Sequence, residues 1–245
     1  MQKTLQWAMH YIAGTETTGR PANWKVAIVA CRTAAALLPI LVAHLLVLTT
    51  RSRPLGALLA TCAIIILDRL ITMSGPSSGP YVTAKLLVKP GPNPEYNLLR
   101  LTVAYAGCLI IRPCLIFSLC LNGAQLWLLP IYTLSACAMV ETTAPENPTD
   151  TPVLLAASWS AWSHWLTAIA VSLLCCLCYI TRLHSTHLFL GCTIMVIAAF
   201  FMPLQLRRLA VHPAVAAVRQ NLRTLALFAS EIILFVIAIL VEKAL

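Results

Sequence analysis

The sequence predicts an all-α membrane protein, a polytopic transmembrane helical bundle of five to seven spans with an N-terminal amphipathic helix. Of its 245 residues, 60% are apolar and only 10% are charged, whereas about a quarter are charged in a typical soluble domain. The apolar residues come in runs of about 20, the length that crosses a hydrocarbon layer of about 30 Å as a helix. Because the loops between these runs are short, residues 25–245 form one predicted transmembrane domain and residues 1–24 a separate N-terminal segment.

The N-terminal segment contains the pattern of a short amphipathic helix. On a helical projection, Met1, Leu5, Ala8, Met9 and Ile12 lie on one face, and polar residues occupy the rest of the surface. Two placements follow from this pattern. The helix either lies in the membrane interface with its apolar face toward lipid, or packs on the loops of the protein itself.

Seven apolar segments follow the N-terminal segment. They cover residues 26–48, 54–73, 98–120, 125–140, 153–180, 188–204 and 222–241. The second and the seventh come closest to an uninterrupted span of about 20 residues. The fourth is short and contains Pro130, which favours a hairpin with the third segment, turned at Asn122 and Gly123. Seven spans is therefore the central prediction, within the range of five to seven.

Three connecting segments differ in composition. Residues 74–94 contain five prolines and three glycines, a density that predicts a loop without a helix. Residues 141–152 are acidic, with Glu141 and no basic residue, whereas residues 205–223 contain four arginines. The net charge is +9, and arginines that flank apolar segments fit contact with anionic lipid better than nucleic-acid binding. We expect membrane lipids, and no nucleic acid, as partners.

Ionisable residues inside the apolar segments are the candidates for a functional site. They are Arg32, Asp68, Arg69, Arg112, His164 and Glu231. A charge at bilayer depth costs at least about 2.5 kcal/mol on insertion scales, so each is expected to have a partner or to reach the interface. Asp68 can pair with Arg32 or Arg112. Glu231 can pair with Arg223 or His164.

Two interpretations apply to Asp68 and Glu231. They form either a proton or ion relay, or ion pairs that hold helices together, and the ion pairs are favoured because neither has a second carboxylate three or four residues away. His164 lies among Trp159, Trp162 and Trp165. That aromatic group is more typical of an interfacial belt than of a substrate cage.

The sequence lacks the motifs of several enzyme classes. It has no aspartate-rich pair, no H-E-x-x-H, no G-x-S-x-G and no phosphate-binding glycine pattern. Its ten cysteines all lie in or at the ends of apolar runs, where cysteine behaves as a small hydrophobic residue. We therefore assign no catalytic residue, no metal site and no cofactor.

The first third of the chain has a distinctive order of segments. The opening M-Q-K-T-L-Q-W-A-M-H-Y-I is followed by Cys31 and Arg32, by Arg51 and Arg53, and by I-I-I-L-D-R-L-I-T-M-S-G. This order resembles the peroxin-eleven family of peroxisomal membrane proteins and related proteins of glycosomes. The resemblance covers residues 1–75. It implies an organelle membrane protein that shapes, elongates or divides peroxisomes, or forms a metabolite pore in them, alone or with other membrane proteins.

The same resemblance implies a role for the N-terminal helix. It would enter one leaflet as a wedge, with Leu5, Trp7, Met9 and Ile12 as the inserted residues at the membrane interface.

Three hypotheses remain open from the sequence. The first is organelle membrane shaping or biogenesis. The second is a small transporter or channel with Asp68, Glu231 and Arg112 along a polar path. The third is a membrane-embedded enzyme acting on a lipid or isoprenoid, with Asp68 or Glu231 as general acid. The cellular location of the protein and the surroundings of these two carboxylates distinguish them.

Overall fold

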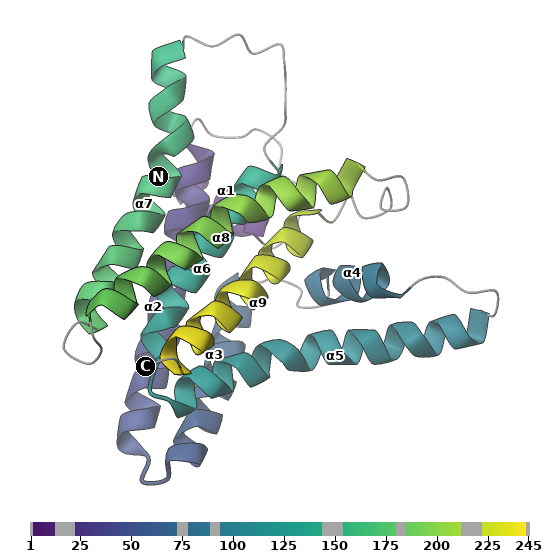
Figure 1. Cartoon of the computed structure of the whole chain (residues 1–245), viewed down its shortest axis with the longest axis vertical. Helices are drawn as coiled ribbons and strands as arrows, with labels where there is room; N and C mark the ends of the chain where they lie inside the picture. The colour runs from purple at the N-terminus through teal and green to yellow at the C-terminus, as the bar shows by residue number, and fades with distance from the viewer. Residues whose placement is uncertain are drawn as a thin grey trace.

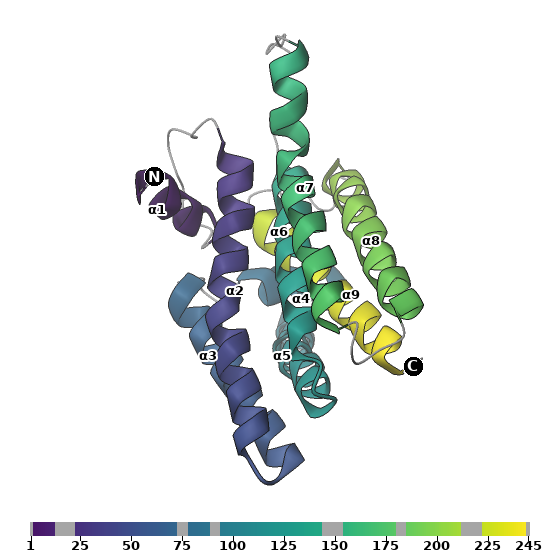
Figure 2. The same cartoon turned by 90° about the vertical axis from the view of Figure 1, so that its left-hand side faces the viewer.

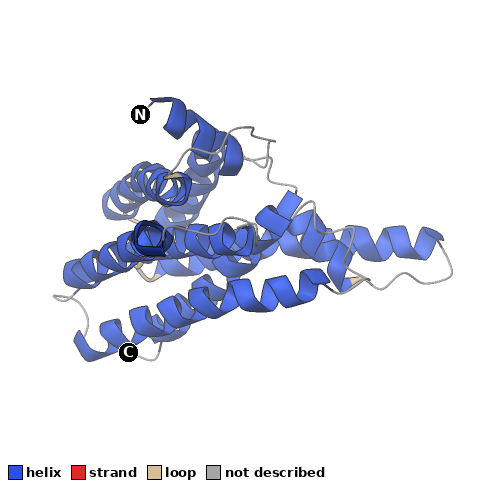
Figure 3. Ribbon diagram, turned by 90° about the horizontal axis from the view of Figure 1, so that it is seen from above, coloured by secondary structure: helices blue, strands red, loops and turns tan. Residues whose placement is uncertain are grey.

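A computed structural model describes residues 2–12, 23–72, 78–88, 94–143, 154–179, 185–211 and 222–243. Throughout these residues the secondary structure is helical, with no strand (Figure 3). The helices are α1 (Gln2–Ile12), α2 (Trp24–Thr49), α3 (Arg53–Thr72), α4 (Ser78–Leu87), α5 (Pro94–Leu121), the 3-10 turn η1 (Gln125–Trp127), α6 (Leu128–Thr143), α7 (Leu154–Tyr179), α8 (Ser185–Val211) and α9 (Leu222–Lys243). The predicted all-α class is confirmed.

Four helical stretches in the described part of the chain have the length and composition of membrane spans. They are Trp24–Thr49, Glu95–Leu121, Phe189–Leu206 and Leu222–Lys243, with mean hydropathy from 1.9 to 2.6. A helix of 18 or more apolar residues is long enough to cross the hydrocarbon layer. These stretches lie in α2, α5, α8 and α9, and they identify the chain as an integral membrane protein.

Tight turns join two of the helix pairs. α2 ends where the Thr50 backbone N–H donates to the Leu46 carbonyl, and α3 begins three residues later. Between α5 and η1, Gly123 has a φ of 72°, a left-handed conformation that glycine adopts without steric cost. The predicted turn at Asn122 and Gly123 is confirmed.

Three predicted boundaries are wrong. The proline-rich segment 74–94 contains the helix α4, with Pro80 in its first turn, where the missing N–H of proline has no helical partner to lose. α6 extends to Thr143 and α8 extends to Val211, so Glu141 and Arg208 belong to helices rather than loops. Helix ends without strong capping residues are the positions that a sequence pattern defines least well.

α6 is the centre of the fold. It packs against α2, α7, α8 and α9, and every residue from Pro130 to Val140 is buried. A helix that is apolar on all sides is stable only when neighbours cover all of them. The surrounding helices therefore meet around α6.

The outward faces of the surrounding helices are apolar as well. Leucines are exposed along α2, α3 and α7, including Leu37, Leu41, Leu45, Leu58, Leu173 and Leu177. A soluble protein rarely exposes such continuous apolar surface. On a membrane protein, this surface is the one that contacts acyl chains.

The helices do not form a parallel bundle. The N-terminal half of α5 extends away from the other long helices, with α4 alongside it (Figure 1). α4 contacts both α5 and α9. At the other side of the molecule, α1 lies against the N-terminal part of α2 (Figure 2).

Gly79 allows α4 to approach α9 closely. A Cβ atom at this position would lie 2.8 Å from the Thr224 carbonyl oxygen and 2.8 Å from the Phe228 Cβ. Gly79→Ala is therefore expected to lower the free energy of unfolding by about 1–3 kcal/mol, because one helix must move away from the other. Thermal unfolding of the purified protein in detergent measures this change.

Gly107 provides the matched control for this substitution. It lies within α5, and a Cβ atom there would meet nothing within 4 Å. Gly107→Ala should leave stability unchanged or raise it by about 0.5–1 kcal/mol, since glycine weakens a helix interior. Equal effects of the two substitutions would show that the contact between α4 and α9 is not close.

Candidate functional site

Four charged side chains from four different helices meet inside the protein. Arg32 lies on α2, Asp68 on α3, Arg112 on α5 and Glu231 on α9. The two carboxylates and the two guanidiniums alternate around a closed ring, which we call the charge ring. It joins segments that are up to 199 residues apart in the sequence.

Each carboxylate in the charge ring binds both arginines. Arg32 places Nη1 2.5 Å from Asp68 Oδ1 and Nη2 2.8 Å from Glu231 Oε1. Arg112 places Nη2 2.7 Å from Asp68 Oδ2 and Nε 3.1 Å from Glu231 Oε2. The ring has no net charge, and each of its four carboxylate oxygens lies within 3.1 Å of a guanidinium nitrogen.

Burial makes this compensation necessary. The side chains of Arg32, Asp68 and Glu231 are 3–4% exposed, and Arg112 is 23% exposed. An isolated ion in such surroundings costs several kcal/mol, and a partner with good geometry offsets that cost. The ring therefore fixes how α2, α3, α5 and α9 are placed relative to one another.

Tyr132 of α6 covers the charge ring. The guanidinium carbon of Arg32 lies 4.3 Å from the centre of the Tyr132 ring, and that of Arg112 lies 5.7 Å away. Arg112 Nη2 also donates to the Tyr132 hydroxyl at 3.4 Å. Both arginines thus lie within the range of a cation–π interaction, which is strongest where water is excluded.

The sequence predicted half of this arrangement. The pairing of Asp68 with Arg32 or Arg112 is confirmed, since Asp68 binds both. The pairing of Glu231 with Arg223 or His164 is wrong, because the arginines of the charge ring occupy Glu231.

The remaining candidates lie outside the charge ring. Arg223 lies over the ring of Tyr11 in α1, at 4.8 Å, and His164 belongs to a second cluster. Arg69 is on α3, and its side chain lies outside the described residues.

The second cluster contains Lys25, Glu141 and His164, from α2, α6 and α7. Lys25 Nζ lies 2.9 Å and His164 Nε2 lies 2.8 Å from the same carboxylate oxygen, Glu141 Oε1. Lys25 donates a hydrogen bond to Glu141 Oε1, and this ion pair compensates the carboxylate charge of Glu141 inside the protein.

Sequence reasoning missed Glu141 and Lys25. The acidic composition of residues 141–152 predicts a loop that begins at Glu141, although Glu141 follows directly on the apolar segment 125–140. A buried histidine in a neighbouring segment was the available signal, because such a group needs a hydrogen-bonding partner.

Two adjoining cavities lie beside this cluster, between α7 and α8. The first, of about 280 Å³, is bounded by Lys25 and Glu141, by the aromatic rings of Trp162, Trp165 and Phe200, and by Pro203 and Leu204. We call it the polar cavity. The second, of about 230 Å³, has the same three rings and otherwise aliphatic residues and Phe201, and we call it the apolar cavity.

α1 packs on the protein. Ile12 is 4% exposed, Ala8 is fully covered, and the rings of Trp7, Tyr11 and Trp24 contact one another at centroid distances of 5.1–6.1 Å. Trp7 is half-buried.

The other two residues predicted to enter the interface are Leu5 and Met9, and their side chains lie outside the described residues. Ala8 and Ile12 are thus covered within the protein, and α2 is the helix against which α1 packs.

Comparison with protein-family models, with curated protein sequences and with solved structures finds no match for this chain.

Proposed function

We propose that this protein is an integral membrane protein of an intracellular organelle, of the peroxisome or glycosome type, that shapes, enlarges or divides the membrane containing it. In this proposal five to seven helices span the membrane. α3, α6 and α7 are added to the four helices with membrane-length stretches, α2, α5, α8 and α9. α1 lies at the membrane interface as an amphipathic helix attached to α2. Other copies of the chain, or other organelle membrane proteins, would be its partners.

The closed charge ring is the observation that carries this choice among the three hypotheses. A transporter or an acid catalyst requires Asp68 or Glu231 to bind and release a proton or an ion. Each of these carboxylates is instead bound by two guanidiniums and 3–4% exposed. Charges arranged in this way stabilise the helix packing, which fits a protein that acts through its shape and its contacts with lipid.

The organelle is proposed on the resemblance of residues 1–75. Within this region α1 packs against α2 and buries Ala8 and Ile12, and the aromatic group of Trp7, Tyr11 and Trp24 is of the kind that collects at the membrane interface. In the proposal α1 lies level with the headgroups, where an amphipathic helix can insert apolar side chains into the outer part of a leaflet.

A tagged full-length protein tests the proposal in cells. We expect the tag to coincide with a peroxisomal or glycosomal marker and to stay in the membrane pellet after an alkaline carbonate wash, because removing charge does not release spanning helices. Leu5→Glu combined with Met9→Glu should leave the protein in the pellet but change the size or number of the organelles. Each apolar side chain kept out of the lipid loses about 1.5–3 kcal/mol of membrane affinity.

The matched control changes the same helix by the same charge on its polar face. Gln6 and His10 are exposed, so Gln6→Glu combined with His10→Glu should not alter the organelles. A signal at the plasma membrane, or organelles unaffected by the changes at Leu5 and Met9, would contradict the proposal.

A further inference from the structure

The polar cavity has the features of a site for a quaternary ammonium group. Trp162, Trp165 and Phe200 form one wall of the cavity. Trp162 is stacked on Phe200 at a centroid distance of 6.4 Å, and Trp165 is tilted against Phe200 at 5.6 Å. Trp162 is 55% exposed, whereas Trp165 is buried and forms the base of the group. Aromatic groups of this kind bind quaternary ammonium ions through cation–π attraction.

The same cavity presents one charge of each sign. Glu141, an anion held by Lys25 and His164, can compensate a ligand cation. Lys25 has three N–H donors, and among the described residues it donates to Glu141 alone, so two donors remain for a ligand phosphate. A zwitterion with a cation and a phosphate a few bonds apart matches this pattern.

The apolar cavity continues along α7 and α8 from the same three rings. Its other walls are Leu166, Ile169, Val196, Ile197 and Phe201, and it exposes no polar surface. The two cavities together reach the size of small-molecule sites, about 300–1,000 Å³. A ligand that occupies both is therefore polar at one end and hydrocarbon at the other.

We propose that these two cavities bind a phospholipid with a phosphocholine headgroup. The choline lies against Trp162, Trp165 and Phe200 beside Glu141, the phosphate contacts Lys25, and an acyl chain follows the apolar cavity. The source of the ligand is the surrounding bilayer, since α8 carries one of the membrane-length stretches and both cavities lie along it. The inference holds whichever organelle contains the protein.

The test is lipid binding to the purified full-length protein, measured by native mass spectrometry in detergent. Phosphatidylcholine, phosphatidylethanolamine and phosphatidylglycerol with identical acyl chains are titrated separately. We expect phosphatidylcholine to bind about ten-fold more tightly than either of the others, a factor that corresponds to one well-placed cation–π contact.

Variants identify the site. Trp162→Leu and Phe200→Leu should each weaken phosphatidylcholine binding about ten-fold, and Trp162→Phe, which keeps an aromatic ring, should restore most of it. Trp162 and Phe200 are both partly exposed, so these variants are expected to fold.

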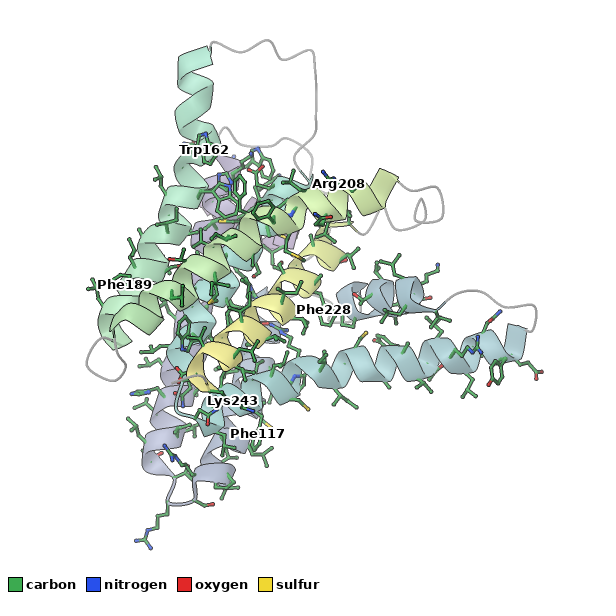
Figure 4. All side chains as sticks on the ribbon, in the orientation of Figure 1. Phe117, Trp162, Phe189, Arg208, Phe228 and Lys243 are labelled. Carbon is green, nitrogen blue, oxygen red and sulfur yellow. The ribbon has the colours of Figure 1, made fainter. Side chains whose placement is uncertain are left out.

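The control is Phe189→Leu, at an exposed aromatic residue of α8 that borders neither cavity. Figure 4 shows Trp162 and Phe189 at opposite ends of the pair formed by α7 and α8. Phosphatidylcholine binding should be unchanged in this variant.

Three results would overturn the proposal. Tighter or equal binding of phosphatidylglycerol would show that Lys25 attracts anions without any selection by the aromatic rings. Equal binding of phosphatidylethanolamine, or equal loss in Trp162→Leu and Phe189→Leu, would show that the cavities do not recognise the quaternary ammonium group.

Discussion

Glu231→Gln is expected to lower the free energy of unfolding by about 3–5 kcal/mol, since it leaves two buried guanidiniums with the single carboxylate of Asp68. The substitution preserves the size of the side chain and removes only its charge. Unfolding of the purified protein in detergent, followed by tryptophan fluorescence, measures the loss.

A second substitution that restores neutrality should recover much of this stability. In Arg112→Met combined with Glu231→Gln, the pair of Arg32 and Asp68 remains and is neutral by itself. We expect the double variant to regain at least half of the loss, because replacing a buried pair costs less than breaking it.

An exposed carboxylate supplies the control. Glu95 lies in the first turn of α5 and is exposed, so Glu95→Gln should cost at most about 1 kcal/mol. A Glu231→Gln protein as stable as the parent would show that the charge ring does not hold the helices together. A double variant less stable than Glu231→Gln would show that neutrality is not what the ring supplies.

The existence of the charge ring could be predicted, but its connections could not. A charge at membrane depth requires a partner, and this reasoning found Asp68 and its two arginines. The partner of Glu231 depends on which helices face each other, and segment order does not determine that.

One wrong pairing could nevertheless have been excluded. Arg223 and Glu231 lie on the same helix eight residues apart, about 12 Å along its axis at 1.5 Å per residue.

The helices themselves followed from hydrophobicity, with errors where local chemistry permits two outcomes. The prolines and glycines of residues 74–94 predicted a loop, yet Pro80 in the first turn is compatible with a helix. The acidic, proline-containing composition of residues 141–152 predicts a loop that includes Glu141. In the structure the charge of Glu141 is stabilised by Lys25 and His164 from two other helices, contacts that only the tertiary fold creates.

The second large effect is expected at Tyr132, the aromatic residue that covers the charge ring. Tyr132→Ala should lower the free energy of unfolding by about 3–5 kcal/mol, because it removes a fully buried ring and its edge-on contact with Phe235. It also removes the cation–π contacts with Arg32 and Arg112. Unfolding in detergent measures the loss, as for Glu231.

Two further variants separate the contribution of the Tyr132 aromatic ring from that of its hydroxyl and from that of an exposed cation–π contact. Tyr132→Phe keeps the aromatic ring and loses only the hydroxyl that accepts from Arg112, at 3.4 Å, so it should cost at most about 1.5 kcal/mol.

Tyr96 also has an arginine over its aromatic ring, with Arg100 at 4.6 Å, but Tyr96 is exposed. Tyr96→Ala should therefore cost no more than about 1 kcal/mol. Equal losses of unfolding free energy in Tyr96→Ala and Tyr132→Ala would mean that burial over the charge ring adds nothing to the interaction. A large loss confined to Tyr132→Ala would assign the stabilisation to an aromatic ring held against two arginines away from water.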